Sequence, residues 1–458
     1  MLLSAYYVMP ITSEPIENGA VLVRNGKIYD VGKADMMRLR YPEEQCRDYG
    51  KSVLMPGFVD VHCHMDGSAL RGVVHDVPYS EWRSYMDFGR EKLTPSDKHD
   101  SAMVGCLEAI ASGITTLADI SSNDATVDAM QVLGMRGVAY REVCAMDKSR
   151  VDHAMRVASD DLDRWAAKVD SGRIFMGIAP AAPFRCNPLV YRRCSDFAGS
   201  CLRVAMHLAG SREEYNFVRY GSSPFSVHGM DESCHFVECP PWLPTGVTPV
   251  KYALNWGAFE AENTMAINCV YVNDEDLKKL KQYNVSVALA PRANCQLGMG
   301  VAPMDEFLRM GFRVGLGTDS PAATDSIDMF ANMRTGMLIQ RALHSGQFLS
   351  ATTMLEMGTM GGARALWMDH RIGSLEVGKY ADIIAVDISK SHLMPTSDVA
   401  SAVVNSASST DVIMTMVGGK VLYEDQKWEV GVDVDAAIDT FIKLRKSLRS
   451  KLSKQQDN

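Results

Sequence analysis

Two histidines separated by a single residue are the first side chains in this sequence whose spacing suits metal binding. His62 and His64 end the apolar run VLMPGFVDVHCH. Side chains on a β-strand repeat every second residue, so both imidazole rings would project from one face. Pro56 and Gly57 before the pair and Gly67 after it predict a strand that passes into a loop. Two imidazoles at such a junction provide half of a typical metal site.

Two further candidate ligands end other apolar runs. His207 ends LRVAMH, and Asp319 ends RVGLGTD. Taken singly, such a histidine is more often a core residue and such an aspartate a helix cap. Together with His62 and His64 they provide three imidazoles and one carboxylate, a set that suits Zn²⁺, Fe²⁺ or Mn²⁺ and leaves a position open for water. We therefore predict one divalent transition metal per chain.

The elements that would position these ligands alternate between strands and helices. Between residues 53 and 365, apolar strand-like runs alternate with helical stretches such as 96–111 and 274–283. Such alternation indicates a parallel sheet, and eight runs predict an α/β fold with a closed (β/α)₈ barrel. Because the C-terminal ends of barrel strands open on the usual active site, the candidate ligands should converge there.

The two ends of the chain are rich in predicted strands. Residues 20–31 predict a hairpin around Asn25–Gly26, residues 413–428 repeat the pattern around Gly418–Gly419, and residues 380–387 predict another strand. These segments suggest a barrel inserted between the two halves of a β-sandwich.

The predicted domain organisation follows from these elements. We expect the N-terminal part of the sandwich over 1–55, the barrel over 56–370, and the C-terminal part with a tail helix over 371–458. Residues 211–262 are too long for a plain connection and predict a lid over the barrel mouth.

Composition and charge exclude several classes of protein. The chain has 458 residues, of which 47% are apolar and 22% charged, so it is not a mostly disordered chain. A formal net charge of −9 argues against a nucleic-acid binder held by bulk charge. The sequence shows no apolar run of about 18 residues and no signal-peptide pattern. Eleven irregularly spaced cysteines favour reduced thiols. We expect a cytoplasmic protein without membrane or nucleic-acid partners.

Several motifs together are similar to one known family. They are MPGFVDVHCHMDGSALRG, LTPSDKHDSAMVGCLEAIASGITTLAD, HLAGSREE, GVAPMDEFLRMGFRVGLGTDSPAATDSIDMFANMR and IGSLEVGKYADIIAVD. Over nearly its whole length the chain resembles the amidohydrolase superfamily, in its aminohydrolase/chlorohydrolase branch. The resemblance implies a metal-dependent barrel with a composite β-sandwich, metal ligands at His62, His64, His207 and Asp319, and a homo-oligomer. It also implies a hydrolase that removes an amino group, or sometimes a halide or amine, from purine-, pteridine- or triazine-like rings.

The sequence departs from that family in the polar layer around the metal. Deaminases of this branch usually carry a glutamate three residues after the third ligand histidine, where this chain has Gly210. The histidines expected at the ends of the fourth, sixth and seventh strands correspond to Ala181, Asn268 and Leu289. The resemblance therefore covers the metal ligands but not the groups that move protons onto the ring.

These departures divide the expected mechanism into two parts. A metal can lower the pKa of bound water to about 7 and so give a hydroxide nucleophile, and Asp319 would accept the proton from that water. Gly210 supplies no acid for the leaving group, and loss of such a donor typically costs a factor of about 10² to 10⁴. Replacement acids are expected among residues of 211–262 that otherwise belong to a solvated helix start or a surface loop: Glu213, Glu214, His228 and His235.

Three residues are candidates for binding the substrate, each with an alternative structural role. Trp82 matches an aromatic residue that the family places near the substrate, and a core tryptophan is the alternative. Arg141 would pair with a substrate carboxylate or with an internal acid. Asn268 would bind the hydroxide or a substrate carbonyl, or remain a satisfied amide at the end of a strand.

The sequence thus predicts a metal-dependent hydrolase of a nitrogen heterocycle, with hydrolytic deamination as the leading reaction. The first alternative is displacement of a good leaving group, namely halide, thiolate or alkoxide, because such a group departs without a proton. The second is a metal-binding pseudoenzyme. The presence of all four candidate ligands argues against it, because a scaffold has no need of them.

Overall fold

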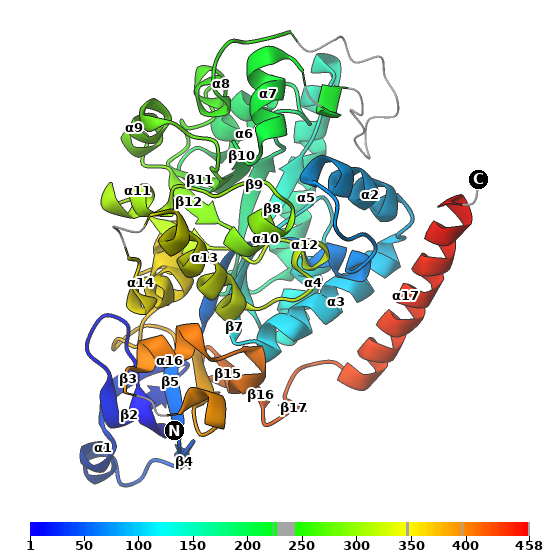
Figure 1. The fold of residues 1–458 in the computed structure, drawn as a ribbon. Helices are drawn as coiled ribbons and strands as arrows, with labels where there is room; N and C mark the ends of the chain where they lie inside the picture. The colour runs from blue at the N-terminus through cyan, green and yellow to red at the C-terminus, as the bar shows by residue number, and fades with distance from the viewer. Residues whose placement is uncertain (223, 227–242, 345–347, 395–396, 457–458) are drawn as a thin grey trace.

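The protein consists of a parallel barrel and a second sheet built from both ends of the chain (Figure 1). The computed structural model describes residues 1–222, 224–226, 243–344, 348–394 and 397–456. The eight parallel strands of the barrel follow chain order: β6 (Phe58–Cys63), β7 (Ile114–Ser121), β8 (Arg136–Val143), β9 (Ile174–Pro180), β10 (Arg203–Leu208), β11 (Asn263–Asn268), β12 (Ser286–Leu289) and β13 (Val314–Leu316). A parallel bridge between Cys63 and Asp319 joins the first strand to the last. The predicted fold class is therefore confirmed.

Helices surround the barrel, as expected for alternating β and α segments (Figure 1). They are α2 (Tyr79–Glu91), α3 (Pro95–Ala111), α4 (Ala125–Leu133), α5 (Val151–Lys168), α6 (Leu189–Ala198), α7 (Arg212–Tyr220), α8 (Pro249–Asn255), α9 (Asp274–Gln282), α10 (Pro291–Gln296), α11 (Met304–Arg309), α12 (Pro321–Thr324), α13 (Met329–Leu343), α14 (Ala351–Glu356) and α15 (Gly362–Ala365). The helices predicted over 96–111 and 274–283 correspond to α3 and α9. Thr94 begins α3 with a capping box and Asn273 does the same for α9, so both starts have a local cause.

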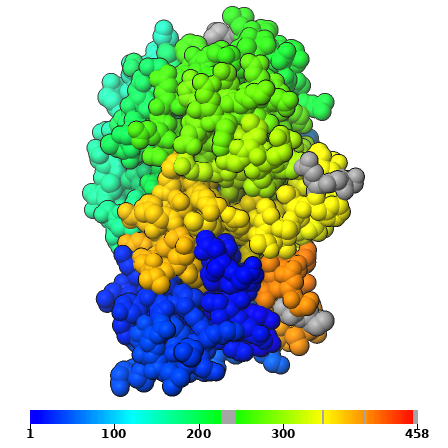
Figure 2. Space-filling view, turned by 90° about the vertical axis from the view of Figure 1, so that its left-hand side faces the viewer, coloured from blue at the N-terminus to red at the C-terminus, as the bar shows by residue number. Residues whose placement is uncertain are grey.

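The terminal segments pair in one nine-stranded sheet. Its strands are β1 (Leu2–Val8), β2 (Ile16–Arg24), β3 (Lys27–Lys33), β4 (Cys46–Asp48), β5 (Ser52–Pro56), β14 (Ile383–Asp387), β15 (Val412–Val417), β16 (Lys420–Glu424) and β17 (Lys427–Trp428). Strand β5 pairs with β14, which brings the two ends of the chain together. Figure 2 shows the N-terminal and C-terminal segments side by side at one end of the molecule. Both predicted hairpins form, and Asn25, Gly26, Gly418 and Gly419 all have positive φ, as the tight turns require.

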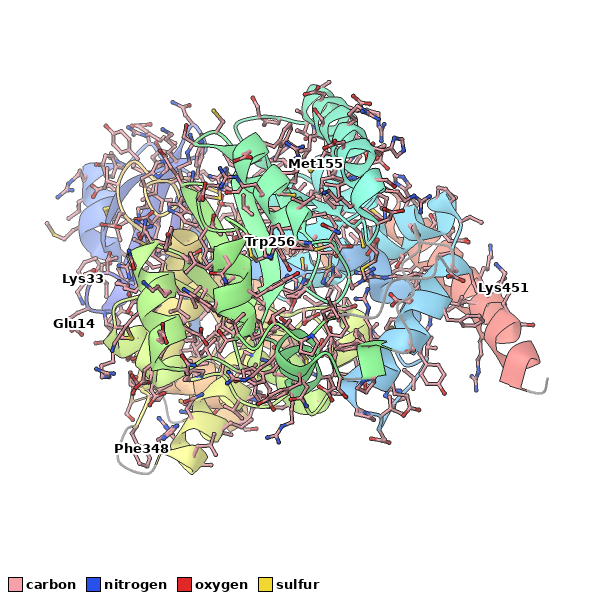
Figure 3. All side chains as sticks on the ribbon, turned by 90° about the horizontal axis from the view of Figure 1, so that it is seen from above. Glu14, Lys33, Met155, Trp256, Phe348 and Lys451 are labelled. Carbon is pink, nitrogen blue, oxygen red and sulfur yellow. The ribbon has the colours of Figure 1, made fainter. Side chains whose placement is uncertain are left out.

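The remaining helices are α1 (Ala34–Arg40) and α16 (Val399–Asn405) near the terminal sheet, and α17 (Val434–Gln456) at the C-terminus. Seen from above, α17 with Lys451 lies on the opposite side of the molecule from Lys33 in the terminal sheet (Figure 3). Arg445 of α17 donates a hydrogen bond to the carbonyl oxygen of Ala69, at 2.8 Å. Ala69 belongs to the short helix η1 (Met65–Leu70) directly after His64, so the C-terminal helix braces that turn.

A buried ion pair joins the barrel to the terminal sheet. Arg136 begins β8, and its Nε lies 2.6 Å from Oδ2 of Asp382, which precedes β14. Both side chains are 2% exposed. The backbone N–H of Gly418 also donates to Asp382, at 2.7 Å. The pair therefore links three segments that are distant in sequence.

Removal of the arginine from this pair should strongly destabilise the fold. Arg136→Ala leaves the carboxylate of Asp382 buried without its cation, which typically costs about 3–5 kcal/mol. Urea unfolding would measure the change. Arg309→Ala is the matched control, because its partner Glu306 lies in an exposed pair and such pairs contribute about 1 kcal/mol or less. Equal losses in the two variants would contradict this role for Arg136.

The segment 211–262, predicted as a lid, contains α7, the short helix η3 (Pro224–Ser226) and α8. Phe225 of η3 stacks on Phe184, with ring centroids 3.9 Å apart. Residues 227–242, with the candidate acids His228 and His235, lie outside the described residues. Within the described part of the chain, no helix is both long enough and apolar enough to span a bilayer.

Candidate active site

Three histidines meet at the C-terminal ends of the barrel strands. His62 is in β6, His64 directly follows that strand, and His207 is in β10. Nε2 of His62 lies 3.1 Å from Nε2 of His207, and one ring nitrogen from each of the three lies within 4.8 Å of the others. The barrel brings β6 and β10 together although they are far apart in sequence, as expected for parallel strands of one barrel.

The environment keeps these rings neutral. Burial holds the pKa of His64 and His207 well below 6.5, and it also lowers the pKa of His62. His64 Nδ1 lies 2.7 Å from the carbonyl oxygen of Ile120, so this nitrogen carries the proton and Nε2 keeps its lone pair. Neutral imidazole is the form that binds a metal ion.

Asp319 provides a carboxylate beside these rings. It follows β13 with a φ of +62°, and its N–H donates to the carbonyl oxygen of His62 at 2.9 Å. Its Oδ1 accepts a hydrogen bond from Ser320 N at 2.6 Å, while Oδ2 lies 3.9 Å from Nε2 of His62. One oxygen is thus tied to the backbone and the other faces the histidine cluster.

Behind the ligands, Asp60 holds the end of β13 in place. Its side chain accepts hydrogen bonds from the N–H groups of Thr318, at 2.9 Å, and His62, at 3.3 Å. Burial raises the pKa of Asp60 to about 7. This carboxyl group therefore links the strand that carries His62 to the turn that carries Asp319.

The arrangement fits a divalent metal ion. Two Nε2 atoms 3.1 Å apart repel through their lone pairs unless a proton or a cation lies between them, and burial disfavours the proton. A divalent cation accepts several such lone pairs together with a carboxylate. The three histidines and Asp319, which the sequence singled out as candidate ligands, are thus brought together by the fold.

A cavity of about 30 Å³, the metal-side cavity, opens beside the three histidines and Asp319. Its walls come from the ligand cluster, from the loop before α11 and from helix α2: His64, His207, Asn268, Met299, Asp319, Tyr79, Trp82, Arg83, Met86 and Arg90. Trp82, a candidate substrate-binding residue, thus lines the cavity. Its Nε1–H donates to the carbonyl oxygen of Ala322 at 3.2 Å. That bond fixes the indole against the helix that follows Asp319.

Gly210 and Asn268, two of the departures from the family pattern, adjoin each other. A Cβ atom on Gly210 would lie 3.2 Å from Nδ2 of Asn268 and 3.3 Å from Cε of Met299. Asn268 is 3% exposed, and its Oδ1 has no hydrogen-bond partner in the described part of the structure. The amide thus lines the cavity with an available acceptor, next to the space where the family usually carries its glutamate.

Glu214, one of the candidate replacement acids, serves the backbone instead. Its carboxylate accepts hydrogen bonds from Ala209 N at 2.7 Å and Gly210 N at 3.0 Å. Burial raises the pKa of Glu214 to about 7. Of the residues of 211–262 that are described, none lines the metal-side cavity. The prediction that this segment supplies a polar group to the cavity stays a prediction, because residues 227–242 lie outside the described residues.

A second and larger cavity, of about 410 Å³, lies on the other side of Arg90. Five cationic and two acidic side chains line it: Arg90, Lys98, Arg141, Arg150, Arg185, Asp66 and Glu142. Arg141 Nε lies 2.7 Å from Oδ2 of Asp161, so of the two partners proposed for this arginine the structure shows the internal acid. Arg141 nevertheless forms part of the wall.

The polar face of α2 was not among the sites predicted from the sequence. Tyr79, Arg83 and Arg90 line the metal-side cavity, yet none of them was singled out. A signal was available, because residues 83 and 90 are seven apart and share one face of a helix that also carries Trp82. Whether that face turned toward the metal or toward solvent depended on packing.

Comparisons with known proteins show the family of this chain. The sequence profile of the Amidohydrolase family matches residues 53–422. A 5-methylthioadenosine/S-adenosylhomocysteine deaminase of Caldanaerobacter subterraneus subsp. tengcongensis is 32% identical over 392 residues, covering 84% of each chain. A protein with the same description from Syntrophobacter fumaroxidans is 31% identical and covers 92% of each chain.

Solved structures show the same architecture. A zinc-bound adenosine deaminase of Xanthomonas campestris is 25% identical, with a TM-score of 0.83 over 98% of each chain. A zinc-bound atrazine chlorohydrolase of Arthrobacter aurescens is 21% identical, with a TM-score of 0.81 over 97% of this chain and 99% of its own. The second likeness shows a shared fold.

Proposed function

Because this chain belongs to the Amidohydrolase family, we propose that it uses a divalent metal to deaminate an amino-substituted nitrogen heterocycle by hydrolysis. The observation that carries this proposal is the cluster of three neutral histidines with Asp319 at the barrel mouth, of which His64, His207 and Asp319 line one cavity. The deaminase names of several relatives favour loss of an amino group over loss of another substituent.

We infer that His62, His64, His207 and Asp319 hold one metal ion per chain. Three imidazoles and one carboxylate suit Zn²⁺, Fe²⁺ and Mn²⁺, and zinc is the metal in the two solved structures described above. When bound, such an ion activates a water molecule for attack on a ring carbon.

The chain's own residues would carry the remaining steps. The carboxylate of Asp319, whose Oδ1 is hydrogen-bonded to Ser320 N and whose Oδ2 faces the histidines, would accept the proton of the attacking water. Asn268 offers Oδ1 to an N–H group of the heterocycle, which would orient the ring. Trp82 packs against the ring from the α2 side.

Protonation of the leaving amino group requires an acid. Asn268 and Tyr79, two described residues that line the cavity, are hydrogen-bond donors and not acids at neutral pH. Asn268 can donate a hydrogen bond from Nδ2, but an amide does not release a proton at neutral pH. Tyr79 lines the same cavity, and burial raises the pKa of its hydroxyl above the usual 10, so that hydroxyl also acts as a hydrogen-bond donor. Both groups can therefore stabilise negative charge that develops on the ring without giving up a proton.

An assay of the metal-loaded protein against a panel of heterocycles tests the proposed function. The panel contains adenosine, 5′-methylthioadenosine, S-adenosylhomocysteine, guanine, pterin, cytosine and a chlorotriazine, with ammonia and chloride measured separately. We expect metal-dependent release of ammonia from at least one amino compound. Chloride without ammonia would favour displacement of a good leaving group. Release of neither product by folded, metal-loaded protein would contradict the proposal and favour the pseudoenzyme.

Restoring the missing groups should increase deamination. Gly210→Glu combined with Asn268→His supplies an acid and an imidazole, and a positioned donor contributes about 10²–10⁴-fold. We expect ammonia release to rise by at least about 10²-fold, measured with the best amino substrate of the panel.

The single substitution Gly210→Glu is the control for this pair. It should gain less, because its Cβ would lie 3.2 Å from Nδ2 of the unchanged Asn268. No gain in the double variant, with its metal still bound, would show that the missing acid does not limit this enzyme.

The homo-oligomer implied by the family resemblance stays a prediction. Sedimentation velocity of the metal-loaded protein measures it directly. A single species with the 50.4 kDa mass of one chain would contradict it.

A further inference from the structure

Helix α2 presents two guanidinium groups to the metal-side cavity. Arg83 and Arg90 are seven residues apart and therefore share one face of the helix. Both line the cavity of about 30 Å³ together with His64 and His207. Their side chains are only 16% and 18% exposed, respectively. A Cβ on Gly67, three residues after His64, would lie 3.8 Å from Nη2 of Arg90, which places this guanidinium beside the ligand turn.

These cations are close enough to act on the metal ligands. Arg83 and Arg90 line the same cavity as His64 and His207, so the two guanidinium groups lie across it from the candidate metal ligands. The charged groups of this lining are two guanidinium groups and the carboxylate of Asp319, so a divalent ion held there would leave an excess of positive charge. A neutral substrate would leave this charge uncompensated at the reacting centre.

The acidic partner of Arg83 lies away from the cavity. Nε of Arg83 donates to Oδ2 of Asp87 at 3.1 Å, and Nη2 lies 2.8 Å from Oδ1 of the same residue, one turn further along α2. Asp87 lines neither of the two cavities described above, so the arginine faces the substrate space and its partner does not.

The positive charge continues into the larger cavity through Arg90, which lines both. There Arg185 Nη1 lies 3.2 Å from Oε1 of Glu142, and Asp66 lies 3.9 Å from Arg90. Lys98, Arg141 and Arg150 add three more cationic side chains to this wall, and Asp66 and Glu142 are its two acids. The lining as a whole is thus cationic.

We propose that Arg83 and Arg90 form an anion subsite, so that the heterocycle deaminated by this protein carries a carboxylate or phosphate on the ring or close to it. Nε of Arg83 donates to Asp87, so this guanidinium would bind the anion through its terminal nitrogens, and Arg90 would add a second cationic donor. The charge of the substrate offsets that of the metal and the arginines, and the paired anion sets the ring's orientation. The deamination of an anionic substrate rests on the proposed function. The preference for binding an anion is a property of the cavity, and it can be measured without turnover.

Binding of an inert matched pair tests the subsite directly. Orotate is a pyrimidine that carries a carboxylate, uracil is its uncharged counterpart, and neither has an amino group to lose. Titration calorimetry with the metal-loaded protein should show orotate binding at least about tenfold more tightly than uracil. A parallel titration with uridine 5′-monophosphate and uridine asks whether a phosphate is the preferred anion.

Substitutions then assign the preference to α2. Arg90→Gln and Arg83→Gln should each weaken binding of the preferred anion about 10- to 100-fold and leave uracil and uridine within about twofold. Arg192→Gln is the matched control, because Arg192 also pairs with a carboxylate four residues later, Asp196, on a half-exposed helix face. Arg192→Gln should change the affinity for neither the charged nor the uncharged ligand.

The outcomes separate the two hypotheses. Equal binding of charged and uncharged ligands by the wild-type protein, which needs no variant to fold, would overturn the anion subsite. A preference that survives both arginine substitutions would overturn its assignment to α2. An anion preference lost in Arg90→Gln, in a protein that releases no ammonia from any amino heterocycle, would support the subsite while contradicting the proposed deamination.

An activity comparison extends the test to turnover. Pterin-6-carboxylate against pterin places the charge on the ring, and adenosine 5′-monophosphate against adenosine places it at a distance. We expect the charged member of at least one pair to be deaminated with a kcat/KM at least about tenfold higher, and Arg90→Gln to remove that advantage. Faster turnover of the uncharged member of both pairs would overturn the proposal.

Discussion

Asp319→Asn should retain the fold and lower the rate of hydrolysis by at least about 10²-fold, the lower end for loss of a general base. The amide keeps the shape of the side chain, and its Oδ1 can still accept the hydrogen bond from Ser320 N. It cannot accept a proton from the attacking water, and it is a weaker ligand than a carboxylate. Steady-state kinetics with the best substrate of the heterocycle panel would measure the loss.

Asp325→Asn is a suitable control for this experiment. Asp325 follows the same strand by a few more residues, but its side chain is 38% exposed and lies 3.6 Å from His75 at the surface. It should leave turnover within about twofold of wild type, since a surface substitution of this kind changes little. Near-normal turnover in Asp319→Asn, with its metal content measured, would move the base to another residue.

His207→Ala should lose most of the bound metal and, with it, the activity. The wild-type protein is expected to contain about one transition metal per chain. Removal of one imidazole deletes a direct ligand and leaves a gap in a site built from β6 and β10. Metal content after dialysis, determined by mass spectrometry, measures this effect independently of any substrate.

The matched control for His207 is His99. His99, Asp124 and Asp128 form another cluster of potential ligands among the described residues. The ammonium group of Lys168 pairs with both carboxylates of that cluster, so a cation is already present there. His99→Ala should therefore leave the metal content unchanged. Full occupancy in His207→Ala would show that His207 is not a ligand.

The sequence alone determined the fold class and the candidate metal ligands. Each strand or helix can be recognised from the periodicity of its own residues. The alternation of these strands and helices along the chain then predicts a barrel. The spacing of His62 and His64 similarly requires only that residues 58–63 form a strand. Asn25–Gly26 and Gly418–Gly419 predicted their hairpins because positive φ at both turn positions is a local requirement.

Contacts between distant segments were decided only by the tertiary structure. Arg141 has an acidic partner, but its identity as Asp161 depended on how α5 packs against β8. Glu214 follows His207 closely enough to suggest an acid at the metal. The first turn of α7 instead directs its carboxylate to the backbone N–H groups of Ala209 and Gly210.

The polar face of α2 shows most clearly where the sequence is insufficient. Residues 83 and 90 share a face by helical periodicity, yet the same periodicity allows that face to meet solvent. Packing of Trp82 and Met86 against the segments after His64 and Asp319 turns the two arginines inward. A local pattern specifies which side chains lie together on an element. The direction they face depends on the packing of the whole barrel, and for α2 that packing places two cations beside the candidate metal ligands.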